Sequence, residues 1–132
     1  MKKSIIFIRL MVGVIFFSEG IQKFVFPEAL GVGRFIKIGI PAPSLLAPFV
    51  GGVEIFFGFL ILLGWHTRWA SIPLLIDITV AILTTKIPIF IHSGFWHMAH
   101  EARTDYSMLL GLLFLFFAGS GEWSFDSLRG QR

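Results

Sequence analysis

Four apolar stretches fill most of this 132-residue chain, and they restrict it to folds that a lipid bilayer can solvate. A helix needs about 20 mostly apolar residues to cross the hydrocarbon core of a bilayer. The chain is 55% hydrophobic and 14% charged, whereas a soluble domain has about 25% charged residues. We therefore predict one all-α membrane domain over residues 1–132, an antiparallel bundle of four transmembrane helices. The expected spans are residues 4–23, 44–65, 69–90 and 105–119.

The segment between the first two spans breaks the helical pattern. It contains several glycines and prolines, namely Pro27, Gly31, Gly33, Gly39, Pro41 and Pro43. It is still apolar in part, so we expect a long loop that lies at the membrane interface or folds back against the bundle. Gly31 and Gly33 follow no strand, so they do not match a nucleotide-binding fingerprint.

Ionisable residues within and beside the spans are the main functional signal. A charge that faces lipid costs about 2.5–3.5 kcal/mol on insertion scales, so such groups usually face the interior of a bundle. Small residues recur at helical spacing beside several of these charges and predict close helix packing there. The predicted inner faces are Arg9, Gly13, Phe16 and Gly20 in the first helix and Ala47, Gly51, Glu54 and Gly58 in the second. The candidate polar site comprises Arg9, Glu19, Lys23, Glu54, Asp77, Lys86, Asp105 and Tyr106.

The depth of each residue suggests how these groups could pair. At a rise of about 1.5 Å per residue, Arg9 can reach Glu54 or Asp77, and a guanidinium suits a carboxylate. Nearer the opposite membrane face, Glu19, Lys86 and Tyr106 could bind a ligand headgroup. Simpler roles stay open for all of them. Buried ion pairs are often architectural, Glu19 and Lys23 are spaced to pair along one helix, and Asp105 could cap the fourth helix.

The composition and the motifs exclude several classes of function. No cysteine is present, so disulfides and thiolate ligands are excluded. The net charge is +3, but the basic residues are dispersed, which argues against nucleic-acid binding. His97, His100 and Glu101 are spaced to meet one metal ion on a helical turn. That spacing is not specific, so we expect no metal site and interpret the histidines as interfacial residues.

The order of several short motifs resembles the DoxX family of small membrane proteins. The resemblance rests on residues 31–41, 50–54, 64–70, 86–89 and 100–111. It implies a four-helix protein of the prokaryotic inner membrane with a polar interior formed by Arg9, Glu19, Lys23, Glu54 and Asp77. One branch of that family supplies the membrane subunit of a quinone-linked oxidoreductase. The family provides no agreed catalytic residue.

These observations lead to one main functional prediction. We expect an accessory subunit of a quinone-linked oxidoreductase, with a buried polar pocket for a lipophilic ligand such as a quinone and no covalently bound cofactor. The expected partners are the bilayer and a soluble or membrane oxidoreductase, and a homo-oligomer is left open. The alternatives are a membrane chaperone or assembly scaffold and a proton or small-solute carrier. The two membrane faces would carry equal numbers of basic residues. Because Lys2 and Lys3 precede the first span, we expect both termini to be cytoplasmic.

Overall fold

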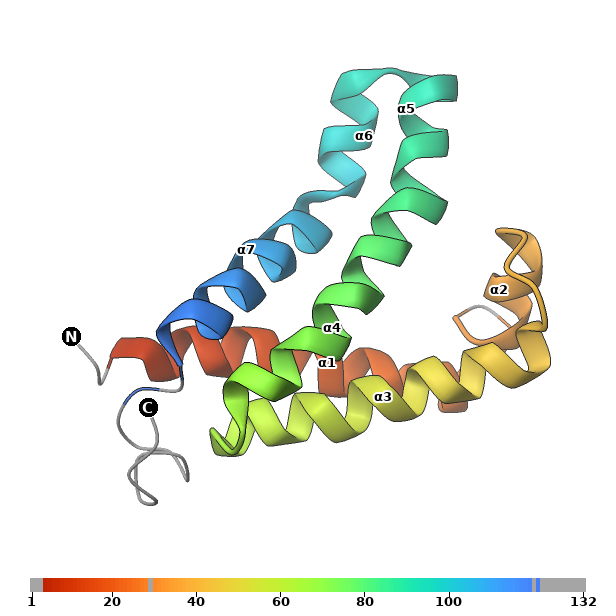
Figure 1. The fold of residues 1–132 in the computed structure, drawn as a ribbon. Coiled ribbons are helices and arrows are strands. Elements are labelled where there is room, and N and C mark those ends of the chain that lie inside the picture. Colours follow the sequence, from red (N-terminus) through yellow and green to blue (C-terminus); the bar gives the residue numbers. More distant parts are fainter. Residues whose placement is uncertain (1–3, 29, 120, 122–132) are drawn as a thin grey trace.

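The computed structural model describes residues 4–28, 30–119 and 121, and every regular element in that part of the chain is helical. The long helices run through the expected apolar stretches (Figure 1). In chain order the elements are α1 (Ile5–Val25), α2 (Val32–Lys37), α3 (Pro43–Leu63), α4 (Thr67–Ala81), the π-helix η2 (Ile82–Lys86), α5 (Ile87–Ser93), α6 (Phe95–Glu101) and α7 (Arg103–Ala118).

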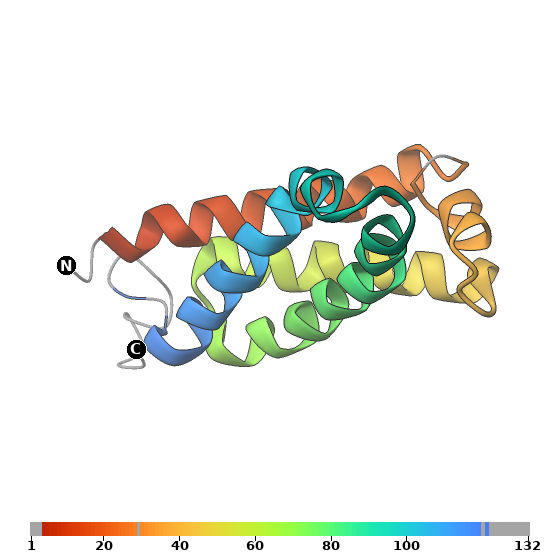
Figure 2. The same cartoon turned by 90° about the horizontal axis from the view of Figure 1, so that it is seen from above.

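Helices α1 and α3 form one closely packed pair, and both views show them side by side (Figures 1 and 2). Glycines make this contact possible. A Cβ atom on Gly20 would lie 2.6 Å from the Gly51 carbonyl oxygen, and one on Gly58 would lie 2.9 Å from the Phe17 nitrogen. The small-residue faces predicted for these two helices are buried, including Arg9 and Glu54.

Helices α4 and α7 form the second pair. It packs against the first pair through contacts of α4 with α3 and of α7 with α1. The core lies where the two pairs meet. It comprises Val12, Phe16, Ile61, Ala70, Leu74, Ile78, Met108, Leu112 and Leu115. Beyond this core the α4–α5 and α6–α7 arms lean away from α1 and α3 (Figure 1).

The third apolar helix changes its winding in the middle. Helix α4 leads into the π-helical turn η2 and continues as α5 to Ser93, three residues beyond the expected end at residue 90. Pro88 has no N–H and its ring clashes with the carbonyl four residues earlier, which is that of Thr84. A π-helical turn at residues 82–86 is therefore the local response to this proline.

Two features differ from the expected architecture. Among the residues that the structure describes, three helical stretches are long and apolar enough to cross a membrane, namely Ile5–Val25, Pro43–Leu63 and Thr67–Ser93. The fourth expected span, 105–119, corresponds to the 16-residue α7, and Ala102 separates this helix from α6. The segment between the first two spans is not only a loop, because it contains the short helix α2, which packs on α3.

Candidate functional site

A cavity of about 520 Å³ lies between the α1–α3 pair, α2 and the α4–η2–α7 side of the molecule. Most of its lining residues are apolar. The lining residues come from α1, α2, α3, α4, η2 and α7 and from the residues that flank α2. Seven ionisable side chains also line it: Glu19, Lys23, Arg34, Glu54, Asp77, Lys86 and Asp105. Six of these belong to the polar set expected from the sequence, so the fold brings most of that set to one cavity.

An ion pair joins α1 to α3 in the wall of this cavity. Lys23 Nζ lies 2.6 Å from Glu54 Oε1, and the two side chains are 15% and 7% exposed. Asp77 of α4 lines the same cavity, and its carboxyl group interacts electrostatically with the Glu54 carboxyl group. Three helices therefore contribute charged groups to one cluster, which we call the Lys23–Glu54–Asp77 cluster.

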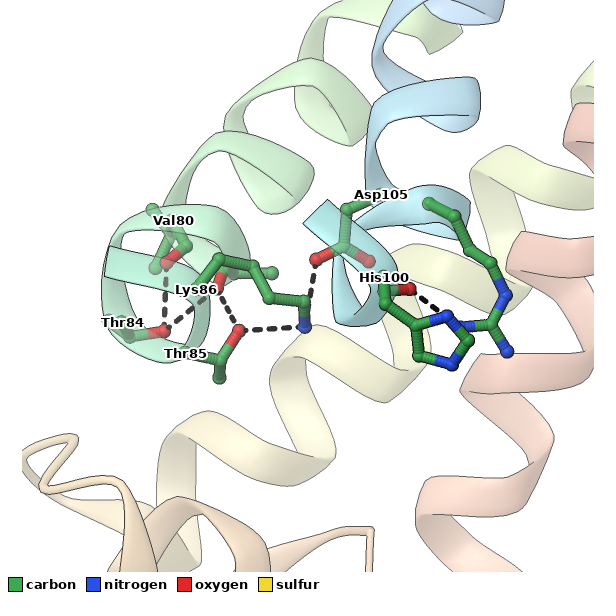
Figure 3. A network of polar contacts seen from close by, with 8 residues as sticks. Val80, Thr84, Thr85, Lys86, His100 and Asp105 are labelled. Atoms are coloured by element: carbon green, nitrogen blue, oxygen red, sulfur yellow. Dashed lines mark hydrogen bonds and ion pairs between the residues drawn. The ribbon is translucent and has the colours of Figure 1, made fainter. Parts of the chain in front are cut away.

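A second ion pair joins η2 to α7 (Figure 3). Lys86 Nζ lies 3.1 Å from Asp105 Oδ2, and Lys86 also donates to Thr85 Oγ1 at 3.0 Å. The contact with Asp105 is an ion pair without the alignment of a good hydrogen bond. Thr84 and Thr85 donate their hydroxyl groups to the carbonyl oxygens of Val80 and Ala81, which lie at the end of α4 directly before the π-helical turn.

The structure corrects the expected pairing of Arg9. This side chain is buried, but its guanidinium donates to the carbonyl oxygens of Ile61 at 3.2 Å and Leu62 at 3.1 Å. Those carbonyls belong to the last turn of α3, beyond which no N–H continues the regular helical pattern. The Ile61 carbonyl oxygen also accepts the Gly64 N–H at 3.0 Å, so Arg9 adds a second donor to it. Glu54 lies seven residues before Ile61, about 10 Å along the helix, and Lys23 pairs with it instead. Arg9 does not line the cavity.

Tyr106 also lies apart from the cavity, contrary to its proposed place beside Glu19 and Lys86. Its side chain is 62% exposed and is not among the lining residues. Glu19 does line the cavity, but Lys23 turns toward Glu54 and away from the Glu19 pairing that spacing allowed. A ligand in the cavity would meet Glu19 and Lys86 without meeting Tyr106.

Arg34 is a lining residue that the sequence did not single out. It lies in α2, within the segment expected to be a loop, so helical periodicity gave no reason to consider its side chain. The signal that could have found it is its position directly after Gly31 and Gly33, because two glycines this close together permit tight folding of the chain.

Comparisons with known proteins fit this geometry. The DoxX family model matches residues 4–87. The chain belongs to the DoxX family. It is 53% identical to the uncharacterized membrane protein Rv3486 of Mycobacterium tuberculosis over 98% of this chain and 83% of that protein. It is also 29% identical to the "Putative oxidoreductase CatD" of Bacillus subtilis over 90% of this chain and 81% of that protein. No solved structure matches the chain significantly.

The DoxX match covers most of the cavity. It extends from α1 through η2 and includes both lysines, Glu54 and Asp77, while Asp105 lies beyond it on α7. The DoxX region therefore supplies the whole Lys23–Glu54–Asp77 cluster and one partner of the second ion pair.

The metal candidates on α6 do not form a site in the structure. His97, His100 and Glu101 are exposed. Among residues 4–28, 30–119 and 121, no three histidine or acidic side chains are placed to hold a metal ion.

Proposed function

We propose that this DoxX protein is an accessory membrane subunit of a quinone-linked oxidoreductase and holds a lipophilic ligand in the interhelical cavity. The observation that carries the proposal is the combination of apolar walls with two ion pairs in one cavity of about 520 Å³. Small-molecule pockets have volumes of about 300–1,000 Å³, with mostly apolar walls and a few well-placed polar groups. The name of the Bacillus subtilis relative, "Putative oxidoreductase CatD", supports the link to an oxidoreductase.

The lining residues suit a quinone-like ligand. Apolar side chains such as Ile15, Phe49 and Ile78 would contact a ring and its hydrocarbon tail. The Lys86 ammonium and the Lys23 ammonium are donors that could hydrogen-bond a carbonyl oxygen. A bound quinone would supply two-electron redox chemistry, with electrons coming from the partner oxidoreductase.

The carboxyl groups would donate and accept protons during that chemistry. Glu54 and Asp77 both line the cavity, so either carboxyl group could exchange a proton with a ligand oxygen within hydrogen-bond reach. Lys23 holds the Glu54 carboxyl in place and compensates its charge. An interaction scaffold would need the ion pairs but not the cavity beside them.

The proposed setting is the prokaryotic inner membrane with both termini in the cytoplasm. The three long helices would span the bilayer, and α6 with α7 would form a fourth, interrupted span. The cavity would then lie toward the membrane face opposite the termini, because Lys23 is near the end of α1 and Asp105 near the start of α7.

Mass spectrometry of an organic extract from the protein purified in mild detergent tests this function. We expect a quinone at near-stoichiometric amounts in the wild type. Glu54→Gln should lower that amount more than it lowers thermal stability, whereas the matched change Glu101→Gln on the exposed face of α6 should alter neither. Bulk lipid alone in the wild-type extract would refute the ligand-binding function and favour an assembly scaffold.

A further inference from the structure

Two close backbone approaches place the short helix α2, one against the end of α1 and one against the turn that follows α1. A Cβ atom on Gly31 would collide with the Lys23 carbonyl oxygen, and one on Gly33 would collide with the Glu28 carbonyl oxygen. The Gly33 N–H donates to the Pro27 carbonyl oxygen at 2.9 Å. These contacts need residues without side chains, so Gly31 and Gly33 set the position of the helix that follows them.

This position brings one face of α2 to the cavity. Arg34, Phe35 and Ile38 line it, and Phe35 is buried. Lys37, on the same helix, is exposed and does not line the cavity. Arg34 is itself exposed, which places its guanidinium at the edge of the cavity, between the apolar interior and the surroundings.

Arg34 differs from the other cations of the cavity in its pairing. Both lysines form ion pairs with carboxylates, with Nζ to carboxylate-oxygen distances of 2.6 Å for Lys23 and 3.1 Å for Lys86. Within residues 4–28, 30–119 and 121, Arg34 has no carboxylate partner. A guanidinium is always charged at physiological pH and presents five N–H donors and no acceptor. A ligand group that meets it must therefore accept hydrogen bonds, as a carbonyl or anionic oxygen does.

We propose that Arg34 is a specificity-determining residue that binds an acceptor oxygen on the headgroup of the ligand while the apolar part of that ligand fills the cavity. This inference rests on the proposed ligand-binding function and names the chemistry of the ligand: an amphiphile with a carbonyl or anionic oxygen at its polar end. A quinone carbonyl and a phosphate group both have this chemistry.

Equilibrium binding to the full chain in nanodiscs tests the inference with two probes, decylubiquinone and monododecyl phosphate. We expect at least one probe to bind the wild type, and Arg34→Ala to weaken that binding by on the order of tenfold, the loss of one charged hydrogen bond. Arg34→Lys should recover part of the loss because it restores a donor and a charge. Lys37→Ala removes a neighbouring cation outside the cavity and should change binding by less than about twofold.

The outcomes separate this inference from the proposed function. Decylubiquinone binding that is equal in Arg34→Ala and Lys37→Ala would overturn the role of Arg34 and leave the quinone function standing. Binding of the phosphate probe alone, with the expected dependence on Arg34, would support the inference and overturn the quinone as ligand. Failure of both probes to bind the wild type would overturn both proposals.

Discussion

The Lys23–Glu54 ion pair offers the sharpest test of what the buried charges do for stability. Lys23→Met keeps most of the length of the side chain and removes its charge. It leaves the Glu54 carboxyl group buried beside Asp77 without the ammonium 2.6 Å away. Removing one partner of a buried ion pair costs about 3–5 kcal/mol. Because Lys23 is still 15% exposed, we expect the lower end of that range.

A loss of about 3 kcal/mol changes the unfolding equilibrium by roughly a hundredfold. It can be measured by unfolding the protein in mixed micelles of dodecyl maltoside and sodium dodecyl sulfate, followed by circular dichroism. Lys23→Met/Glu54→Leu removes both charges and should recover most of the stability, because an apolar pair of similar size often replaces a buried ion pair without cost. Lys37→Met, an exposed lysine on α2, serves as the control.

Two results would refute this reasoning. A loss below about 1 kcal/mol in Lys23→Met would mean that Glu54 does not depend on the ammonium group, as for an exposed pair. A double variant no more stable than Lys23→Met would mean that the loss does not come from a Glu54 carboxyl group left without its ammonium partner.

Three further predictions address the packing and the limits of the cavity. Gly20→Ala should destabilise the protein by about 1–3 kcal/mol, because its Cβ would lie 2.6 Å from a backbone oxygen of α3. Gly52→Ala on the open side of α3 should be nearly neutral in the same unfolding assay, and equal losses would contradict the packing argument. Leu112→Ala, at a fully buried core position, should cost about 2–5 kcal/mol, which thermal unfolding would detect. Tyr106→Phe should leave the amount of quinone in the extract unchanged, because Tyr106 is exposed. A clear fall in that amount would mean that Tyr106 takes part in ligand binding.

Much of the helical framework follows from the sequence. Apolar runs of about 20 residues predict α1, α3 and the α4–η2–α5 stretch, because a lipid-facing backbone must satisfy its own hydrogen bonds. Small residues at helical spacing predict the buried faces of α1 and α3, including the burial of Glu54. The family could also be recognised from the order of short motifs, and the match over residues 4–87 confirms it.

The pairing of the charges was less predictable. Depth along straight helices suggested that Arg9 could meet Glu54, but Arg9 binds carbonyl oxygens at the end of α3. Depth gives a position along the membrane normal. It says nothing about the rotation of a helix or about which carbonyl oxygens at a helix end can accept a hydrogen bond from a side chain. The long Lys23 side chain reaches across to α3, and a count of residues along α1 alone cannot show that.

The amino-acid sequence is sufficient to place this chain in a membrane, because hydropathy and span length are properties of each segment alone. It is also sufficient to show that charged groups must face inward. The tertiary structure decides which of those groups meet. The cavity forms where α1, α2, α3, α4, η2 and α7 meet. The π-helical turn carries Lys86, which pairs with Asp105 of α7, and the glycine contacts before α2 bring Arg34 to the cavity edge. These placements depend on packing between segments distant in sequence, which no local pattern encodes.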